Sequence, residues 1–302
     1  MAPLANQIHV DSLLSNVSVK YKNSEYIAMS VFPEVAVKKT SDLYRIYDRN
    51  FRIPETKRAN RGVAREHQFE VSSASYVLER HSLKDYVSDT DADNYDLADL
   101  RAETTEELSD VILRRLEKSV ADLFTTTNWS LNVSLAAAGA FNANTTVSNP
   151  IPVFDTGATT VILNSGFKPN YGILPREAFV ACKNHISVLD RTKYTSKEMD
   201  VNILASLFGL DELLVPLTSV DSSQYGSAAS IAALYGDIAF LGYKPPSAGP
   251  LKPSAGYIFR KSLPMVKRWR VEERESDAIE VNMEYVAKVV ASLAGYLIKD
   301  VI

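Results

Sequence analysis

The sequence of 302 residues predicts an α+β fold built from long antiparallel strands, one long helix and a protruding hairpin. Three observations carry this prediction. The charges are sorted into a basic segment followed by an acidic one, an amphipathic helix lies within the acidic segment, and the C-terminal part alternates apolar and polar residues. Hydrophobic residues make up 46% of the chain, which is enough for a substantial core.

Composition excludes several classes of protein. The single cysteine, Cys182, excludes an internal disulfide framework. The net charge of −4 argues against a protein that coats nucleic acid. The first residues lack the basic and apolar regions of a signal peptide, and no apolar run is long enough to span a membrane. We therefore expect that the function of the protein does not involve a membrane.

The basic segment runs from Lys38 to Glu70 and holds nine Lys or Arg against five Asp or Glu. Only 10 of its 33 residues are core-forming, so it has little with which to bury itself. Its aromatic and β-branched residues nevertheless favour extended structure. We predict a long hairpin with strands Val35–Ile53 and Val63–Ser72 and an exposed basic tip between them. Residues 1–30 predict an arm with one short helix.

The acidic segment from Glu79 to Asp122 holds thirteen Asp or Glu against six Lys or Arg, and it contains the strongest helix signal. Thr104–Glu107 has the pattern of a capping box, so the helix is predicted to begin there. It should run for about 20 residues, or roughly 30 Å. Its apolar residues fall on one stripe: Leu108, Val111, Ile112, Leu116, Val120, Leu123 and Phe124.

The remainder alternates short strands and helices. Thr159–Leu163 is predicted as a strand, and Leu174-Pro175 opens a second helix that places Cys182 on its apolar side. A third helix, Asp200–Phe208, ends at Gly209. Further strands are expected over residues 213–217, 238–243, 257–260, 266–275 and 279–289, with a turn at residues 276–277 before the last.

Candidate chemistry is sparse. The stretch Phe154–Ala158 matches the Asp-Thr-Gly loop of aspartic proteases, but that chemistry needs two such aspartates, and we favour a turn between two strands. The run Asp89–Asp96 resembles half of a calcium loop without its glycine and its final glutamate. We favour a solvated lead-in to the helix, and weak ion binding between subunits stays open. His81 and His185 lack the partners of a triad or a zinc site. We expect no catalytic residue, metal or cofactor.

Five stretches, in their order and spacing, carry a resemblance to a known family: Tyr26–Val37, Asp89–Phe124, Pro169–Phe179, Leu204–Val215 and Tyr235–Tyr243. Together they resemble the major capsid proteins of tailed double-stranded DNA bacteriophages, which have the Hong Kong 97 fold, over essentially the whole chain. The first stretch resembles the junction between the N-terminal arm and the extended E-loop. The second resembles the spine helix of the peripheral (P) domain, and the others resemble elements of the axial (A) domain.

The resemblance implies a mixed α/β A domain beside a P domain with a spine helix and long antiparallel strands. The segments that it implies are an arm at 1–33, the E-loop hairpin at 34–80, the P domain at 81–150, the A domain at 151–261, and long P-domain strands returning to the A domain at 262–302.

The family's E-loop lies across the P domain of the neighbouring subunit, so the resemblance implies that the basic hairpin meets a neighbour's acidic segment. The basic residues expected in this contact are Lys38, Lys39, Arg45, Arg49, Arg52, Lys57, Arg58, Arg61 and Arg65. The acidic residues expected opposite them are Asp89, Asp91, Asp93, Asp96, Asp99, Glu103 and Glu106.

The implied function is a structural protein without enzymatic activity, which self-assembles into hexamers and pentamers of an icosahedral head enclosing double-stranded DNA. Expected partners are a portal, a separate scaffolding protein, a decoration protein, and packaged DNA held by weak non-specific contacts. Assembly is expected in the cytoplasm of the host bacterium, and the final location is the virion capsid. Two alternatives are an encapsulin-type nanocompartment shell and, from another class, a dimeric aspartic protease that uses Asp155.

Overall fold

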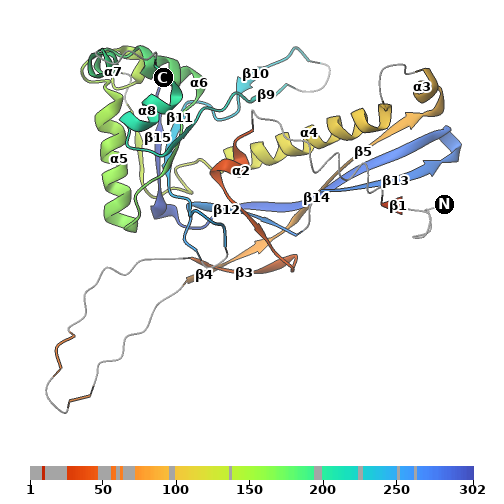
Figure 1. Cartoon of the computed structure of the whole chain (residues 1–302), viewed down its shortest axis with the longest axis horizontal. Coiled ribbons are helices and arrows are strands. Elements are labelled where there is room, and N and C mark those ends of the chain that lie inside the picture. Colours follow the sequence, from red (N-terminus) through yellow and green to blue (C-terminus); the bar gives the residue numbers. More distant parts are fainter. Residues whose placement is uncertain are drawn as a thin grey trace.

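The computed structural model describes residues 9–10, 26–46, 56–58, 62–63, 72–94, 99–135, 138–193, 199–223, 227–249, 252–261 and 264–302. The described elements form two sheets that lie side by side (Figure 1). A larger sheet lies along one long helix, and a smaller sheet is surrounded by shorter helices. A two-stranded hairpin projects from the edge of the larger sheet (Figure 1). The predicted α+β class is confirmed.

The larger sheet is organised around one central strand of 14 residues, β14, which pairs with β13, β5 and β12. Burial alternates with the sequence only from Met283 to Lys288, whereas residues 276–279 are all buried, polar residues included. The strand order is β1-β13-β14-β12-β2, with β5 also on β14. The strands are β1 (His9–Val10), β2 (Glu34–Ala36), β5 (Glu79–Ser88), β12 (Gly256–Arg260), β13 (Met265–Val271) and β14 (Ser276–Val289).

The reversal between β13 and β14 differs from the predicted turn at residues 276–277. Ser276 already pairs with Val271, and the chain turns through a 3-10 segment, η2 (Glu272–Arg274). Glu275 closes this turn with a left-handed φ of 44°. Asp277 was mistaken for a turn residue because aspartate favours turns, but its carboxylate is buried and accepts hydrogen bonds from arginines.

The long helix α4 (Leu100–Ala121) has 22 residues and is about 33 Å long, as predicted. Its start was predicted wrongly. The cap is Asp99, whose side chain accepts from the Arg101 amide, and Thr104 lies inside the helix, where its hydroxyl donates to the Leu100 carbonyl. One apolar face packs into the core through Ile112, Leu116 and Val120. Two short helices, α2 (Ala28–Val31) and α3 (Asp89–Asn94), accompany it.

The smaller sheet has the order β6-β15-β11-β7-β8. Four helices surround it, and two of them, α6 and α8, match the predicted second and third helices. Gly209, which follows α8, has the left-handed φ of 69° expected of a helix stop. The elements are β6 (Asn132–Ser134), β7 (Tyr171–Ile173), β8 (Glu212–Leu214), β11 (Ile238–Gly242), β15 (Gly295–Lys299), η1 (Phe141–Ala143), η3 (Ser292–Ala294), α5 (Pro150–Ser165), α6 (Arg176–Asn184), α7 (Ile186–Thr192) and α8 (Val201–Leu207).

Helix α5 overturns two predictions, the strand at Thr159–Leu163 and the turn at Phe154–Ala158. Asn149 caps the helix, and Pro150 occupies a first-turn position, where its missing N–H costs nothing. Gly157 then lets the helix approach the sheet, because a Cβ there would come within 2.9 Å of the Leu241 and Tyr296 side chains. Tertiary packing thus overrides the strand propensity of a β-branched run.

The protruding hairpin consists of β3 (Ser41–Ile46) and β4 (Ser72–Val77), paired antiparallel from Ser41 opposite Val77 to Ile46 opposite Ser72. The hairpin was predicted, but the structure divides its first strand. β2 pairs with β12 in the larger sheet, whereas β3 leaves that sheet to pair with β4. Of the predicted return strand only Val63 and Ser72 lie within the described residues, and the paired strand is 72–77. A second ribbon is formed by β9 (Ser219–Asp221) and β10 (Ile231–Ala233).

A cluster of aromatic side chains joins the two sheets. Phe124, just past α4, lies 4.8 Å from Phe240 of the smaller sheet and 5.9 Å from Phe32, measured between ring centroids. Trp129 and Tyr235 complete the cluster. One continuous hydrophobic core therefore reaches from the larger sheet across α4 to the smaller sheet. Among the described residues, no helix has the length and apolar character needed to cross a membrane.

Candidate assembly interface

The root of the hairpin has one buried face and one exposed face. Tyr44 and Tyr76 turn inward, with ring centroids 5.4 and 4.7 Å from that of Phe259 on β12. The opposite face carries Leu43, which is 66% exposed, and Val77, which is 59% exposed. Because two apolar side chains of this size stand in solvent on a projecting element, this face is suited to contact with another molecule.

The basic residues predicted for the contact are only partly described. Lys38, Arg45, Lys57 and Arg58 are exposed. Lys39 forms an ion pair of 3.1 Å with Asp42, three residues away. The other four basic residues lie outside the described ranges: Arg49, Arg52, Arg61 and Arg65.

The acidic residues predicted for the contact differ in their surroundings. Asp89 is held by both terminal nitrogens of Arg270, at 2.5 Å each, and Asp99 caps α4. Asp91 accepts a hydrogen bond of 2.6 Å from the Ser88 hydroxyl and remains exposed. The other exposed acidic side chains are Asp93, Glu103 and Glu106, while Asp96 lies outside the described residues.

A network of arginines surrounds Asp277 at the same end of α4. Its carboxylate accepts bonds of 3.0 Å from Arg101 Nε and 2.9 Å from Arg268 Nη2. Arg270, which holds Asp89, lies 3.8 Å from the same carboxylate. The hydrogen bond and charge of Arg270 keep the pKa of Asp89 below its usual value. The sequence did not indicate this network, because its links from Arg101 to Asp277 and from Arg270 to Asp89 span 176 and 181 positions.

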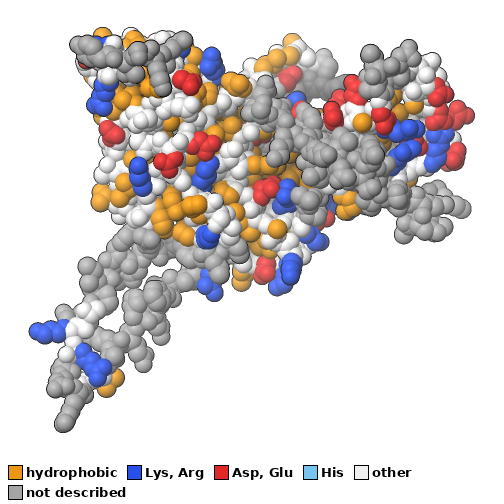
Figure 2. Space-filling model, viewed as in Figure 1, with side chains coloured by type: hydrophobic (Ala, Val, Ile, Leu, Met, Phe, Trp, Pro, Cys, Tyr) orange, Lys and Arg blue, Asp and Glu red, His pale blue; other side chains and the backbone are white. Residues whose placement is uncertain are grey.

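The root of the hairpin and the α3 end of the acidic segment lie at different edges of the molecule. In Figure 1, β3 and β4 emerge at the lower edge, α3 lies at the upper right, and α4 runs above the larger sheet. Figure 2 shows Asp and Glu side chains gathered at the α3 end, with Lys and Arg beside them. The acidic surface and the root of the hairpin of one chain therefore do not face one another.

The residues considered for catalysis are placed where they cannot act together. Asp155 is exposed on the outside of α5, so the interpretation as an aspartic protease loop is wrong. Ser148 Oγ and His185 Nε2 lie 3.0 Å apart, but both residues are fully buried. His185 Nδ1 accepts from the Ser187 amide, so Nε2 carries the proton and donates to the serine instead of taking its proton.

The remaining candidates also have structural surroundings. Burial raises the pKa of the Cys182 thiol, which lies in the core as predicted. His81 stacks on Tyr285 with ring centroids 4.3 Å apart. Within the described ranges, no three His, Cys, Asp or Glu side chains cluster in a way that could hold a metal ion.

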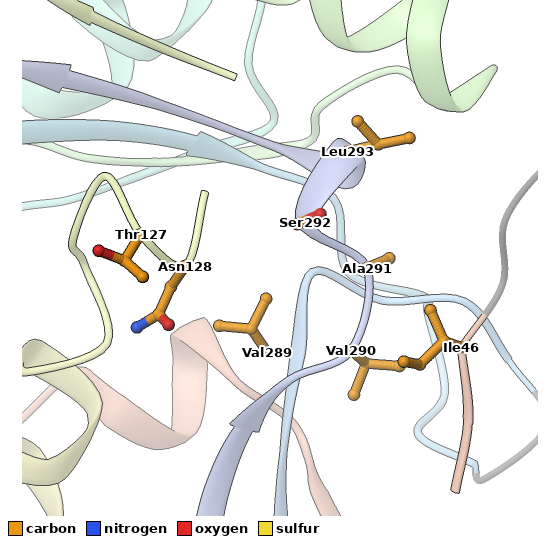
Figure 3. A pocket seen from close by; sticks show the side chains of 8 residues that line it. All are labelled: Ile46, Thr127, Asn128, Val289, Val290, Ala291, Ser292 and Leu293. Atoms are coloured by element: carbon orange, nitrogen blue, oxygen red, sulfur yellow. The ribbon is translucent and has the colours of Figure 1, made fainter. Parts of the chain in front are cut away.

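A hollow of about 260 Å³ lies at the base of the hairpin (Figure 3). Ile46 from β3 faces Val289 and Val290 at the end of β14 across it, and Thr127 and Asn128 form another side (Figure 3). Its lining contains no charged side chain and no histidine, so it offers no acid or base that could activate the hydroxyls of Thr127 and Ser292 for catalysis.

Comparison with curated proteins found relatives that align with most of the chain. The chain is 26% identical over 305 residues to a protein named "Major capsid protein" of Burkholderia phage BcepMu, covering 97% of this chain and 96% of the relative. It is 24% identical over 258 residues to a "Major capsid protein" of Pseudomonas phage JBD67, covering 84% and 78%. No protein-family model matches the chain.

Solved structures share the fold. A phage-related protein from Bordetella bronchiseptica RB50 superposes with a TM-score of 0.79 at 23% identity over 97% of each chain. The capsid of cyanophage P-SCSP1u gives a TM-score of 0.62 at 11% identity, covering 99% of this chain and 92% of that one. A virus-like particle from Pyrococcus furiosus gives 0.57 at 10% identity, covering 95% and 96%. The resemblance to phage capsid proteins that the sequence predicted is confirmed.

Proposed function

We propose that this chain is the major capsid protein of a tailed double-stranded DNA phage, a structural subunit that assembles with copies of itself into the phage head. The relatives named as major capsid proteins align with 97% and 84% of this chain, which supports this function. The fold alone would fit a nanocompartment shell equally well, because it is shared with a virus-like particle at 10% identity. The similarity in sequence favours the phage head.

We extend this proposal to the Hong Kong 97 arrangement of domains. The β3–β4 hairpin would be the E-loop, α4 the spine helix of the P domain, and the smaller sheet with its helices the A domain. Pairing within the sheets supports two changes to the segments expected from sequence. Gly256–Arg260 pairs with β14, so it would belong to the P domain, and Asn132–Ser134 pairs with β15, so it would belong to the A domain.

One observation carries the proposed mode of assembly. The root of the hairpin and the α3 end of the acidic segment lie at different edges of the subunit (Figure 1), so a contact between them requires two copies. Such a contact joins two different surfaces, so successive copies add head to tail, and they close into a ring when the rotation between neighbours divides a full turn. Hexamers and pentamers would be such rings.

The charges set the orientation of this contact. Arg45 and Arg58 from the hairpin would face Asp93 and Glu106 of the neighbour, all of which are exposed. Each exposed pair is worth about 0–1 kcal/mol, so the pairs align the subunits and the apolar face around Leu43 supplies the buried area. Asp89 and Asp99 contribute less, because they already have partners within their own chain.

The remaining partners follow from the proposed place in a phage head. Double-stranded DNA would fill the shell through weak non-specific contacts, and a portal, a separate scaffolding protein and a decoration protein would complete the assembly. Assembly would take place in the host bacterium. The subunit itself would perform no catalysis, in keeping with the structural role of its relatives.

Electron microscopy of the expressed full-length chain tests the function. Closed shells, tubes or rings of capsomers are expected, and a monodisperse small oligomer under all assembly conditions would contradict the proposal. Nuclease-resistant genomic DNA inside native particles distinguishes a phage head from a nanocompartment.

Charge reversal tests the contact. The double variant Arg45→Glu with Arg58→Glu is expected to reduce particle yield, and Glu106→Lys together with Asp93→Lys is expected to restore part of it. Lys168→Glu is the matched control, because Lys168 is exposed beside the smaller sheet and far from the hairpin in sequence. Yields that are equal for the reversed and control variants would refute this pairing.

A further inference from the structure

Glu117 is a fully buried carboxylate at the junction of three segments. It lies in the last turns of α4, and its side chain accepts hydrogen bonds from three donors. Oε1 accepts from the Tyr235 hydroxyl at 2.7 Å and from the Ile27 amide at 3.1 Å. Oε2 accepts from the Ala28 amide at 2.7 Å. Residues about 90 and 118 positions away are therefore held by one side chain.

No cation among the described residues pairs with the Glu117 carboxylate. Arg114 and Lys118, on the same helix, are engaged with other carboxylates. Arg114 pairs with Asp110 at 2.8 Å, and Lys118 pairs with Asp122 at 2.9 Å. From the other packed elements, the groups that face the carboxylate are the two amides and the hydroxyl of Tyr235. A buried carboxylate without a counter-ion is costly, which suggests a purpose beyond packing.

The segment held by Glu117 leads into the hairpin. Ile27 and Ala28 begin α2, and the chain continues through Phe32 into β2 and then β3. Phe32 in turn packs over Gly256 of β12, where a Cβ would lie 2.6 Å from the ring. The carboxylate thus connects the start of the hairpin segment to α4 and, through Tyr235, to the turn before β11.

We propose that Glu117 is a pH-responsive latch, which holds the α2 segment against α4 and the Tyr235 turn, and which acidification tightens. When Oε2 is protonated, Oε1 remains a carbonyl oxygen that can still accept from the Tyr235 hydroxyl and the Ile27 amide. The neutral form thus keeps two of its three donors without a buried charge. Opening of the segment exposes the group to water, where the ionised form is well solvated.

The direction of the pH effect follows from burial. Desolvation raises the pKa of Glu117 above its ordinary value, although its three hydrogen bonds lower it in part. The closed state therefore binds a proton more readily than the open state. Closure is most favourable below the pKa of the open state, and that advantage is lost as the pH rises through the pKa of the closed state.

Amide hydrogen exchange on the full-length, unassembled chain tests the latch. Protection of the Ile27 and Ala28 amides, corrected for intrinsic exchange, is expected to fall several-fold as the pH rises from about 5 to about 8. Glu117→Gln, which mimics the neutral form, is expected to remove this dependence. Glu117→Ala is expected to lower protection at every pH by about tenfold to a hundredfold, because two buried donors lose their acceptor.

Asp110→Asn is the matched control. Asp110 bonds the Tyr26 hydroxyl at 2.9 Å and so holds the same segment two turns away, but it also has Arg114 as a counter-ion. This variant should retain the pH dependence at Ile27 and Ala28. The latch would be refuted if protection of the Ile27 and Ala28 amides did not change with pH in the wild type. It would also be refuted if protection changed with pH equally in the wild type and in Glu117→Gln. The readout needs no particle, so its failure is distinct from failure of the proposed capsid function.

Discussion

The two ends of α4 hold their carboxylates in opposite ways. At the N-terminal end, the buried Asp277 of β14 and the half-buried Asp89 of α3 sit among Arg101, Arg268 and Arg270. At the C-terminal end, Glu117 is buried in an apolar and aromatic junction, and no cation of the described part of the chain pairs with it. Arg270 stabilises the charged form of Asp89 and lowers its pKa, whereas burial favours the neutral form of Glu117 and raises its pKa.

This difference teaches that carboxylates around one long helix need not share a function. Those near its N-terminal end form ion pairs, and the exposed ones are those that we propose contact other copies. At the buried end, protonation of Glu117 can instead change how tightly the segment that leads into the hairpin is held. The following predictions test the contrast, from the largest expected effect to the smallest.

The largest effect is expected at the buried end. Phe124→Ala should lower the free energy of unfolding by about 3–5 kcal/mol, because it opens a cavity where Phe32, Trp129 and Phe240 meet. Chemical denaturation measures this loss. Val111→Ala, on the exposed side of α4, should change stability by less than about 0.5 kcal/mol, and similar losses for both would contradict the view that the junction holds the sheets together.

A smaller loss is expected at the charged end. Asp277→Ala should cost about 1–3 kcal/mol, because Arg101 and Arg268 lose the carboxylate that accepts their hydrogen bonds. Asp155→Ala on the exposed side of α5 is the control and should be close to neutral. Equal denaturation midpoints for the two variants would show that the arginine network adds nothing.

The helix cap ranks next. Asp99→Ala should destabilise α4 by about 1 kcal/mol, because the Arg101 amide loses its acceptor. Asp99→Ser should restore most of this loss, since serine also caps helices. The thermal unfolding midpoints of both variants measure this loss of stability. Equal midpoints for Asp99→Ala and Asp99→Ser would argue against a capping role of Asp99.

The smallest effect is expected from titration of Asp89. Arg270 lowers its pKa, so the stabilisation of α3 is present above the unfolded-state pKa and is lost as the pH falls through the folded-state value. Exchange of the α3 amides should therefore quicken in acid, whereas protection at Ile27 and Ala28 should increase. If protection of the α3 amides and protection of the Ile27 and Ala28 amides changed with pH in the same direction, the contrast between the two ends of α4 would be contradicted. High salt should weaken only the Asp89 effect, because exposed pairs are screened.

Local patterns predicted much of the fold. The stripe from Leu108 to Phe124 indicated α4, the alternation after Ile279 indicated β14, and Gly209 marked the end of α8. Local pattern failed where distant contacts decide. The stretch around Gly157 reads as a turn and a strand, yet it is a helix because it packs against Leu241 and Tyr296.

The sequence also predicted only part of the candidate assembly interface. The sorting of charge between Lys38 and Asp122 identified the hairpin and the acidic segment, but the internal partners of Asp89 could not be foreseen. Glu117 was one acidic residue among thirteen in its segment, and nothing in the sequence distinguished it.

By itself the sequence determined periodic elements, the two charged segments and the resemblance to phage capsid proteins, because these depend on residues close together in the chain. Only the tertiary structure decided which carboxylates are exposed, paired or buried, where β14 begins, and that α2, α4 and the Tyr235 turn meet at one side chain. The physical reason is that solvation and hydrogen bonding depend on neighbours in space, and those neighbours are supplied by residues far apart in the sequence.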